Sequence, residues 1–295
     1  MSGDALALAP AVPGIVAGLK RQASQDGLTV GVRSGSAADS SAAPEVQITL
    51  ARAGQGICTW RIREVPRIYR AAIVIDDLGQ DMQRTRAVLA LPYPLTFSVL
   101  PHLPASHETS AAAALAGREV MLHLPMEPIG DHISPGQGAI LVGMRAPEVA
   151  RIVDADLDSV PNAAGVNNHM GSRATSDPAL MAAVMKDLAA RRLYFIDSRT
   201  APSTVALDAA RQAGIPAFYR SVFLDDTETV DYTLSQLRIF RSVVERQGTA
   251  LAIGHPHPTT LAALGKFLPE LEGDDIELVP ASQLVGLTEV ARPSP

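Results

Sequence analysis

Two adjacent carboxylates, Asp76 and Asp77, are the first residues in this chain whose type and placement indicate chemistry. They follow the apolar run 71–75, which is typical of a buried parallel strand. Neighbouring carboxylates repel each other and lose hydration on burial, so a cation, a shared proton or hydrogen bonds from a helix N-terminus must offset that cost. The structural alternative is that Asp77 only caps the helix expected to begin near Gln80.

Other polar residues stand at the ends of further expected strands. These residues are His123, Asn168, His169, Asp197 and His255. In a closed β/α barrel the carboxyl ends of all strands face one mouth, where such residues would meet. An open doubly wound sheet would bring together only those near its switch point. Polar residues at so many strand ends therefore favour a barrel.

A repeated strand and helix pattern must position these residues. Strands are expected at 71–75, 95–100, 119–122, 164–167, 193–196, 215–219, 249–253 and 276–279, and helices at 80–90, 106–116, 147–160, 178–191, 203–213, 229–247 and 259–268. Seven or eight such units in series predict a parallel α/β architecture. No glycine-rich nucleotide-binding motif follows any of the strands, so no nucleotide site is predicted.

The first part of the chain has a different pattern. A helix is expected at 11–23, followed by strands at 27–33, 45–51 and 56–63. This order predicts a small α+β domain over residues 1–69, ahead of a larger domain over residues 70–290. The small domain holds no catalytic constellation, so we expect it to have an accessory packing or docking role.

Composition excludes several classes of protein. Of the 295 residues, 47% are hydrophobic and 19% are charged, which is ordinary for a globular protein. The net charge of −6 and the absence of a basic run argue against a nucleic-acid partner. The single cysteine, Cys58, cannot form an intramolecular disulfide. No apolar run is long enough to cross a bilayer, so no membrane-spanning segment is expected.

Five motifs together resemble the divergent polysaccharide deacetylase family, a remote branch of the carbohydrate esterases. They are VIDDLG at 74–79, HLPMEP at 123–128, GVNNHMGS at 165–172, FIDSRT at 195–200 and AIGHPHP at 252–258. The resemblance implies a distorted (β/α)7–8 barrel of the polysaccharide deacetylase type. It also implies a metal-dependent hydrolase that removes an acyl group, N-acetyl in the first instance, from a carbohydrate of the cell envelope. Relatives of this kind are commonly exported to the envelope.

The resemblance also implies roles for individual residues. Asp76 would be the general base, Asp77 a metal ligand and His123 the first imidazole ligand. Glu127 stands where the family has its second imidazole, so the third ligand is either Glu127 or His169. We expect His169, because two imidazoles and one carboxylate form an open site for a divalent catalytic metal, with zinc favoured by the ligand types.

The remaining roles concern proton transfer and substrate. His255 matches the last histidine of the family and would protonate the departing amine, with Asp197 orienting it or holding it as imidazolium. Asp225 and Asp226, after the sixth strand, are expected to cap the following helix or to lie at the rim. Substrate contacts are expected from Glu127, Asn168, Arg173 and His257.

A second reading of the same motifs is a catalytically inactive scaffold that binds a glycan or a partner protein. The replacement of an imidazole by Glu127 supports it. The retention of both Asp76 and Asp77 favours the enzyme, because a protein that only binds sugar has no need of a base beside a metal ligand.

Overall fold

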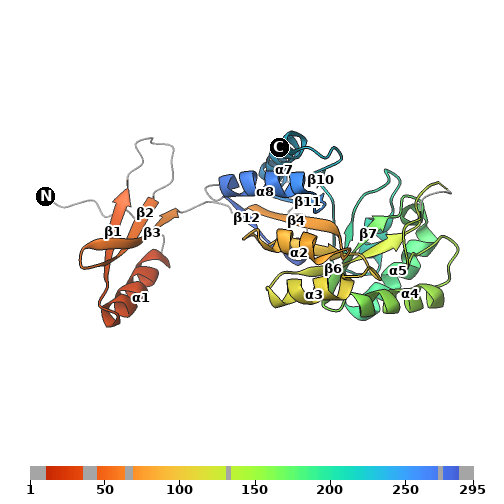
Figure 1. Cartoon of the computed structure of the whole chain (residues 1–295), viewed down its shortest axis with the longest axis horizontal. Helices are drawn as coiled ribbons and strands as arrows, with labels where there is room; N and C mark the ends of the chain where they lie inside the picture. Colours follow the sequence, from red (N-terminus) through yellow and green to blue (C-terminus); the bar gives the residue numbers. More distant parts are fainter. Residues whose placement is uncertain (1–10, 36–44, 64–68, 131–133, 272–274, 286–295) are drawn as a thin grey trace. The chain divides into compact units, whose positions relative to one another are not determined.

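The computed structural model describes residues 11–35, 45–63, 69–130, 134–271 and 275–285. Its backbone packing divides the chain into two compact units, residues 1–68 and 69–295 (Figure 1). None of the helices in the described ranges is long and apolar enough to cross a lipid bilayer.

The first unit is a helix followed by a three-stranded antiparallel sheet. Its elements are α1 (Ala11–Gln25), β1 (Thr29–Gly35), β2 (Glu45–Arg52) and β3 (Gln55–Arg63), with sheet order β1-β2-β3. Val46 and Ile48 alternate along β2 and are buried, and Val16 and Leu19 of α1 pack against them. Period-two alternation in the strand and helical spacing in α1 therefore form one small core between helix and sheet.

The second unit is built on a curled parallel sheet, so the predicted distorted β/α barrel is confirmed. Its strands are β4 (Tyr69–Leu78), β5 (Thr96–Val99), β6 (Val120–Met126), β7 (Ala163–Met170), β8 (Tyr194–Asp197), β9 (Ala217–Tyr219), β10 (Val222–Phe223), β11 (Thr249–Gly254) and β12 (Ile276–Leu278). The order is β10-β11-β4-β5-β6-β7-β8-β9, and β12 also pairs with β4. Because every pairing is parallel, the carboxyl ends of the strands lie at one edge.

The barrel is incomplete between β9 and β10, which are consecutive in the chain and lie at opposite ends of the sheet order. In the described strands no backbone ladder joins them. The two residues between them span the gap: Arg220 N donates to Asp197 O at the end of β8, and Ser221 N donates to Leu251 O in β11. Residues 220 and 221 therefore connect the two edges of the sheet, β9 and β10, which no strand pairing in the described ranges joins.

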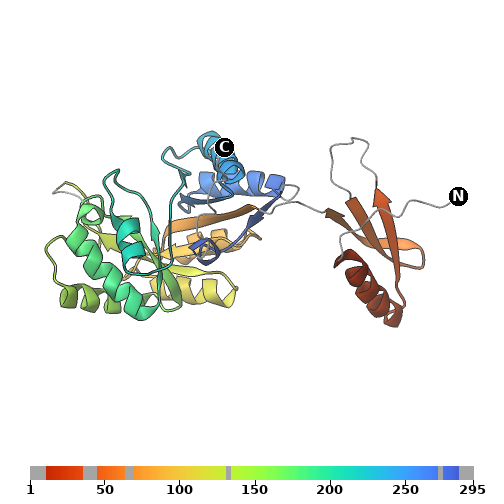
Figure 2. The same ribbon diagram turned by 180° about the vertical axis from the view of Figure 1, so that it is seen from behind.

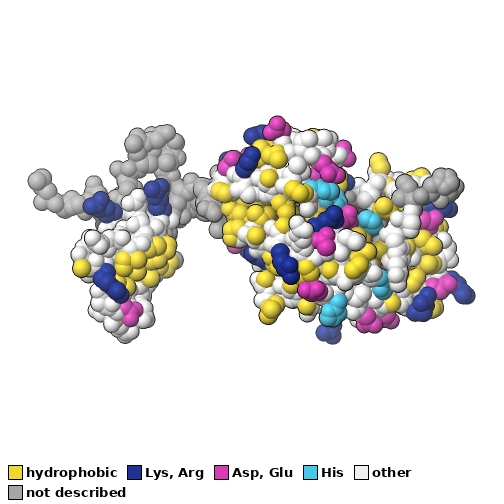
Figure 3. All heavy atoms as spheres, in the orientation of Figure 1, with side chains coloured by type: hydrophobic (Ala, Val, Ile, Leu, Met, Phe, Trp, Pro, Cys, Tyr) yellow, Lys and Arg dark blue, Asp and Glu magenta, His cyan; other side chains and the backbone are white. Residues whose placement is uncertain are grey.

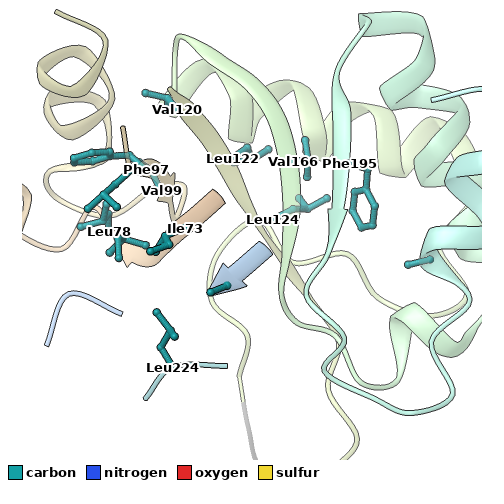
Figure 4. Close-up of a cluster of buried hydrophobic side chains, with 14 of the residues drawn as sticks. Ile73, Leu78, Phe97, Val99, Val120, Leu122, Leu124, Val166, Phe195 and Leu224 are labelled. Carbon is teal, nitrogen blue, oxygen red and sulfur yellow. The ribbon is translucent and has the colours of Figure 1, made fainter. Parts of the chain in front are cut away.

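Helices cover the outer face of this sheet (Figures 1 and 2). They are α2 (Met82–Leu89), α3 (Ser106–Leu115), α4 (Ala146–Ser159), the short 3-10 helix η1 (Ala174–Ser176), α5 (Pro178–Arg191), α6 (Ala206–Gln212), α7 (Val230–Gln247) and α8 (Pro258–Leu271). Alternate strand residues such as Phe97, Leu122, Leu124, Val166 and Phe195 are fully buried in this outer layer (Figure 4). Their burial, at roughly 1.5–3 kcal/mol for each large side chain, holds the strands in register.

The other set of alternate residues forms the inner core of the barrel. Ala72 and Val74 of β4 and Leu251 and Ile253 of β11 belong to it, together with Leu284 of the short helix α9 (Ser282–Val285). On both strands the next inward position lies at the carboxyl end of the sheet. That position carries a polar residue, which is where the candidate site begins.

Most predicted elements are present with small shifts, but three strands run further than expected. β4 continues to Leu78, so Asp76 and Asp77 lie inside it rather than after it. β6 and β7 continue to Met126 and Met170, so His123 and His169 also lie inside strands. Long-range pairing explains the extension, because β6 pairs with β7 up to Met126 and the returning loop places Ile140 beside the same residue. The two-residue strand β10 and the helix α9 were not predicted.

Candidate metal and catalytic site

Strand alternation gathers the polar residues at one place. On the inner face, His123 of β6 lies beside Asn167 of β7 in the parallel ladder, and His169 follows two residues later on the same face. The pairing of β11 with β4 sets His255 next to Asp76. Residues up to 179 positions apart in the chain therefore meet at the carboxyl end of the barrel.

Asp77 reaches the same place through its backbone conformation. In a regular strand it would point away from Asp76, toward the helices. The β4–β5 register shifts between Ile75 and Leu78, and Asp77 has a φ of 55° in the left-handed region. Aspartate tolerates that region better than most residues, at a cost of order 1–3 kcal/mol. The bulge turns the side chain of Asp77 toward the imidazoles of His123 and His169.

Three donor atoms form a triangle at the centre of the site. Asp77 Oδ1 lies 3.2 Å from His123 Nε2 and 3.1 Å from His169 Nδ1, and the two nitrogens are 3.2 Å apart. Donor atoms bound to one tetrahedral zinc ion at about 2.0–2.1 Å lie roughly 3.3 Å from one another. Asp77 Oδ1 is also buried without a hydrogen bond of good geometry. The donor set therefore fits a divalent cation.

The charges around this triangle favour a cation as well. Burial raises the pKa of Asp77, but the neighbouring His123 and His169 outweigh burial and hold that pKa well below its usual range. Burial lowers the pKa of His123, whereas the charge of Asp76 and the contact with Asp77 raise it, with a net rise. A proton and a divalent cation thus compete for the same imidazole nitrogen.

A second histidine and carboxylate pair flanks the triangle. His255 Nδ1 lies 2.9 Å from Asp225 Oδ1, and the backbone N–H of His255 donates to Asp225 Oδ2 at 2.6 Å. Burial lowers the pKa of His255, but the hydrogen bond with Asp225 and the charges of Asp76, Asp225 and Asp77 raise it to about 9. His255 Nε2 lies 3.6 Å from Asp77 Oδ2 and so faces the donor triangle.

The prediction that Asp197 orients His255 is wrong. The carboxylate of Asp197 instead accepts hydrogen bonds from Arg199 N at 2.8 Å and Thr204 Oγ1 at 3.1 Å, within the loop after β8. The expectation that Asp225 caps α7 or lies at the rim is wrong as well. Thr229 caps α7, and Asp225 is buried against His255.

Asp225, His255 and His257 form a second group of donor atoms within 4.8 Å of one another. Their hydrogen bonds argue against a second cation, because Asp225 is already engaged by His255 and by Thr260 Oγ1 at 2.7 Å. The half-exposed His257 lies 3.6 Å from Glu228 Oε2. Figure 3 shows histidine and acidic side chains close together on one face of the larger unit. The expected substrate contact of His257 stays a prediction.

Glu127 does not take part in the donor triangle. Its Oε2 accepts a hydrogen bond from Val142 N at 2.6 Å, and its Oε1 pairs with Arg173 Nη1 at 2.7 Å. Of the two alternatives for a third ligand, the geometry favours His169. Glu127 and Arg173 join the loop after β6 to the loop after β7, and their expected substrate contacts stay predictions.

Asn168 is also bonded within the protein. It is buried, its Oδ1 accepts from Ser198 N at 2.9 Å, and its Nδ2 donates to Met170 O at 2.8 Å. The predicted substrate contact for Asn168 is therefore not supported. Its position on β7 points outward from the site, and its role is to join the ends of β7 and β8.

Sequence reasoning missed Asn167 and misplaced Asp225. The signal for Asn167 was present, because it stands two residues before His169 and period-two alternation puts both on one face. Its side chain contacts both Asp76 and His123. No sequence pattern indicated that Asp225 pairs with His255, since this pairing depends on which strand lies beside β11.

Comparisons with known proteins identify the family and the fold of this chain. The sequence model of the divergent polysaccharide deacetylase family matches residues 73–285. An uncharacterized protein of Haemophilus influenzae is 35% identical over 226 residues, which is 77% of this chain and 80% of the relative. YibQ of Escherichia coli, also uncharacterized, is 37% identical over 226 residues, or 77% and 70% of the two chains. The crystal structure of the uncharacterized protein ATU2773 from Agrobacterium tumefaciens superposes with a TM-score of 0.71 at 25% identity, covering 76% of this chain and 92% of that chain.

Proposed function

Since this chain belongs to the divergent polysaccharide deacetylase family, we propose that it is a metal-dependent hydrolase. Its reaction removes an acyl group from a carbohydrate of the cell envelope. The acyl group that we expect is N-acetyl. The observation that carries the proposal is the donor triangle of Asp77, His123 and His169, with Asp76 and His255 at its sides.

In this proposal the donor triangle holds a divalent cation, for which zinc suits two imidazoles and one carboxylate. A cation there would polarise the acyl carbonyl and lower the pKa of a neighbouring water. Asp77 Oδ1 belongs to the donor triangle. The other carboxylate, Asp76, does not, so it is available to accept a proton. The left-handed backbone at Asp77 is what gives the two adjacent carboxylates separate tasks.

Asp76 is the proposed general base. One carboxylate oxygen, Oδ1, accepts a hydrogen bond from Asn167 Nδ2 at 2.9 Å. The other, Oδ2, lies 3.5 Å from His123 Nε2 and so faces the region of the donor triangle. With one oxygen anchored and the other directed at the reacting centre, Asp76 can accept the proton of an attacking water.

His255 is the proposed general acid. Asp225 bonds its Nδ1 and raises its pKa, so that the ring carries a proton at neutral pH. Its Nε2 faces Asp77 and thus the same reacting centre. Donation of that proton to the departing nitrogen would let the amine leave as a neutral group. His255 would thus supply the proton that the departing amine takes, and Asp76 is the proposed acceptor of the proton that leaves the attacking water.

The alternative is a scaffold that binds a glycan or a partner protein without turnover. It depended on Glu127 standing in place of an imidazole ligand. Because His169 completes the donor triangle and Glu127 has a separate structural role, that argument loses its weight.

The test uses metal-free protein to which Zn²⁺ is returned, with release of acetate from a panel of N-acetylated oligosaccharides as the activity. The variant is Asp77→Asn, and Asp226→Asn, an exposed carboxylate outside the site, is the matched control. We expect wild type and Asp226→Asn to bind one zinc ion and release acetate, and Asp77→Asn to do neither. Stoichiometric zinc without acyl release on the whole panel would favour the scaffold. If the wild-type protein binds no divalent metal, the proposed metal-dependent mechanism is wrong.

A further inference from the structure

Asn167 lies between the proposed base and a proposed metal ligand. We propose that it is the positioning residue that aligns Asp76 with His123, an inference that rests on the proposed function. The side chain is fully buried on the inner face of β7. Its Oδ1 accepts from His123 Nδ1 at 2.9 Å, and its Nδ2 donates to Asp76 Oδ1 at 2.9 Å.

Two serines complete the hydrogen bonds of this amide. Ser98 Oγ donates to Asn167 Oδ1 at 2.7 Å, and Asn167 Nδ2 donates to Ser198 Oγ at 3.3 Å. An amide has two acceptor positions and two donor hydrogens, and all four are used here. A fully bonded buried amide cannot rotate without losing several of these bonds, so its orientation is fixed.

That orientation determines which nitrogen of His123 is free. An ionised carboxylate only accepts hydrogen bonds, so the Asn167 nitrogen must face Asp76 and the Asn167 oxygen must face His123. His123 Nδ1 therefore carries a hydrogen, and Nε2 is the nitrogen that faces Asp77 and His169 and is available to a cation there. This is the tautomer that a cation in the donor triangle requires.

The same amide orients the base. By holding Asp76 Oδ1, it leaves Oδ2 as the oxygen that faces the donor triangle. The oxygen of the Asn167 side chain thus sets the tautomer of His123. The nitrogen of the same side chain sets the orientation of Asp76. These two effects can be separated by substitution, because each uses a different end of the amide.

The experiment compares two variants of similar size. Asn167→Leu removes both ends, whereas Asn167→Asp keeps an acceptor for His123 but replaces the donor to Asp76 by an oxygen. Zinc affinity is measured by competition with a chelator, and kcat by acetate release. We expect Asn167→Leu to lose about 10–100-fold in zinc affinity together with kcat. For Asn167→Asp we expect zinc affinity equal to or above that of wild type and a loss of at least about 10-fold in kcat.

Asn168→Leu is the matched control for loss of a buried asparagine, since Asn168 bonds only to the ends of β7 and β8. It should lower the melting temperature without changing zinc affinity. A merely structural Asn167 would behave in the same way, with equal zinc affinity in all three variants, and that result would overturn the inference.

A measurement on wild type keeps the inference testable should Asn167→Leu fail to fold. Long-range proton–nitrogen spectra of the zinc-loaded protein should show the hydrogen of His123 on Nδ1 and the metal on Nε2. The opposite assignment would overturn it. Failure of the proposed function is distinct, because wild type itself would then bind no zinc or release no acetate. Failure of this inference alone leaves an active, zinc-binding wild type whose Asn167 variants match it.

Discussion

The Asp225 carboxylate contacts His255 twice, through Oδ1 at 2.9 Å from the ring Nδ1 and through Oδ2 at 2.6 Å from the backbone nitrogen. Asp225 is buried, and its own pKa is lowered, because the hydrogen bond with His255 outweighs the effect of burial. Each partner therefore stabilises the charged form of the other. In the proposed mechanism this pair sets the pH range over which His255 would donate a proton.

Asp225→Asn should move the alkaline limit of activity to lower pH. The pKa of His255 is raised to about 9 in the wild type, so its acidic form is present below that pH and is lost as the pH rises through it. Without the Asp225 charge the pKa falls, and kcat/KM should decline from a lower pH. The profile of kcat/KM against pH is the measurement, with Asp226→Asn as control. An unchanged alkaline limit would mean that His255 is not the acid.

Asp76→Asn should separate catalysis from metal binding. The amide cannot accept a proton from water, so kcat should fall by roughly 10²–10⁴-fold. Asp76 is not part of the donor triangle, so zinc content should stay at one ion per chain. Turnover equal to wild type on the same substrates would show that the base is another residue.

Glu127→Ala should destabilise the fold and leave the metal in place. The change removes the acceptor of Val142 N and the partner of Arg173. The free energy of unfolding should fall by about 1–2 kcal/mol, as expected for loss of a partly buried hydrogen bond and ion pair. Denaturant unfolding and chelator competition measure the two quantities. A tenfold loss of zinc affinity would instead return Glu127 to the ligand set.

Removal of the metal should lower thermal stability. A ligand that binds only the folded state stabilises it by about 2.7 kcal/mol at one hundred times its dissociation constant. For a unit of this size that corresponds to roughly 5–10 °C in melting temperature. Addition of a chelator should produce this fall in wild type and almost none in Asp77→Asn. Equal melting curves for wild type with zinc and with chelator would argue against a cation bound by the folded protein.

The amino-acid sequence determined the order and type of most elements of the barrel. Apolar runs of strand length alternate with helical patterns from residue 71 onward, and these local patterns depend only on neighbouring residues. The sequence also showed that polar residues interrupt the apolar runs, because a polar residue in a buried strand carries a cost unless it has a partner. The strands β4, β6 and β7 nevertheless continue past these residues. Asp76, Asp77, His123, His169 and His255 were identified in this way, and the structure brings them together.

Only the tertiary structure decided which of these residues contact one another. Asp225 meets His255 because the two-residue strand β10 lies beside β11, and β8, which ends in Asp197, lies elsewhere in the sheet. A strand of two residues leaves no periodic signal in the sequence, so its neighbour could not be predicted. The inward turn of Asp77 likewise depends on a bulge between β4 and β5, and the role of Asn167 depends on the register of β6 with β7. Strand order and register arise from packing across the whole sheet, and these set the contacts that the candidate chemistry needs.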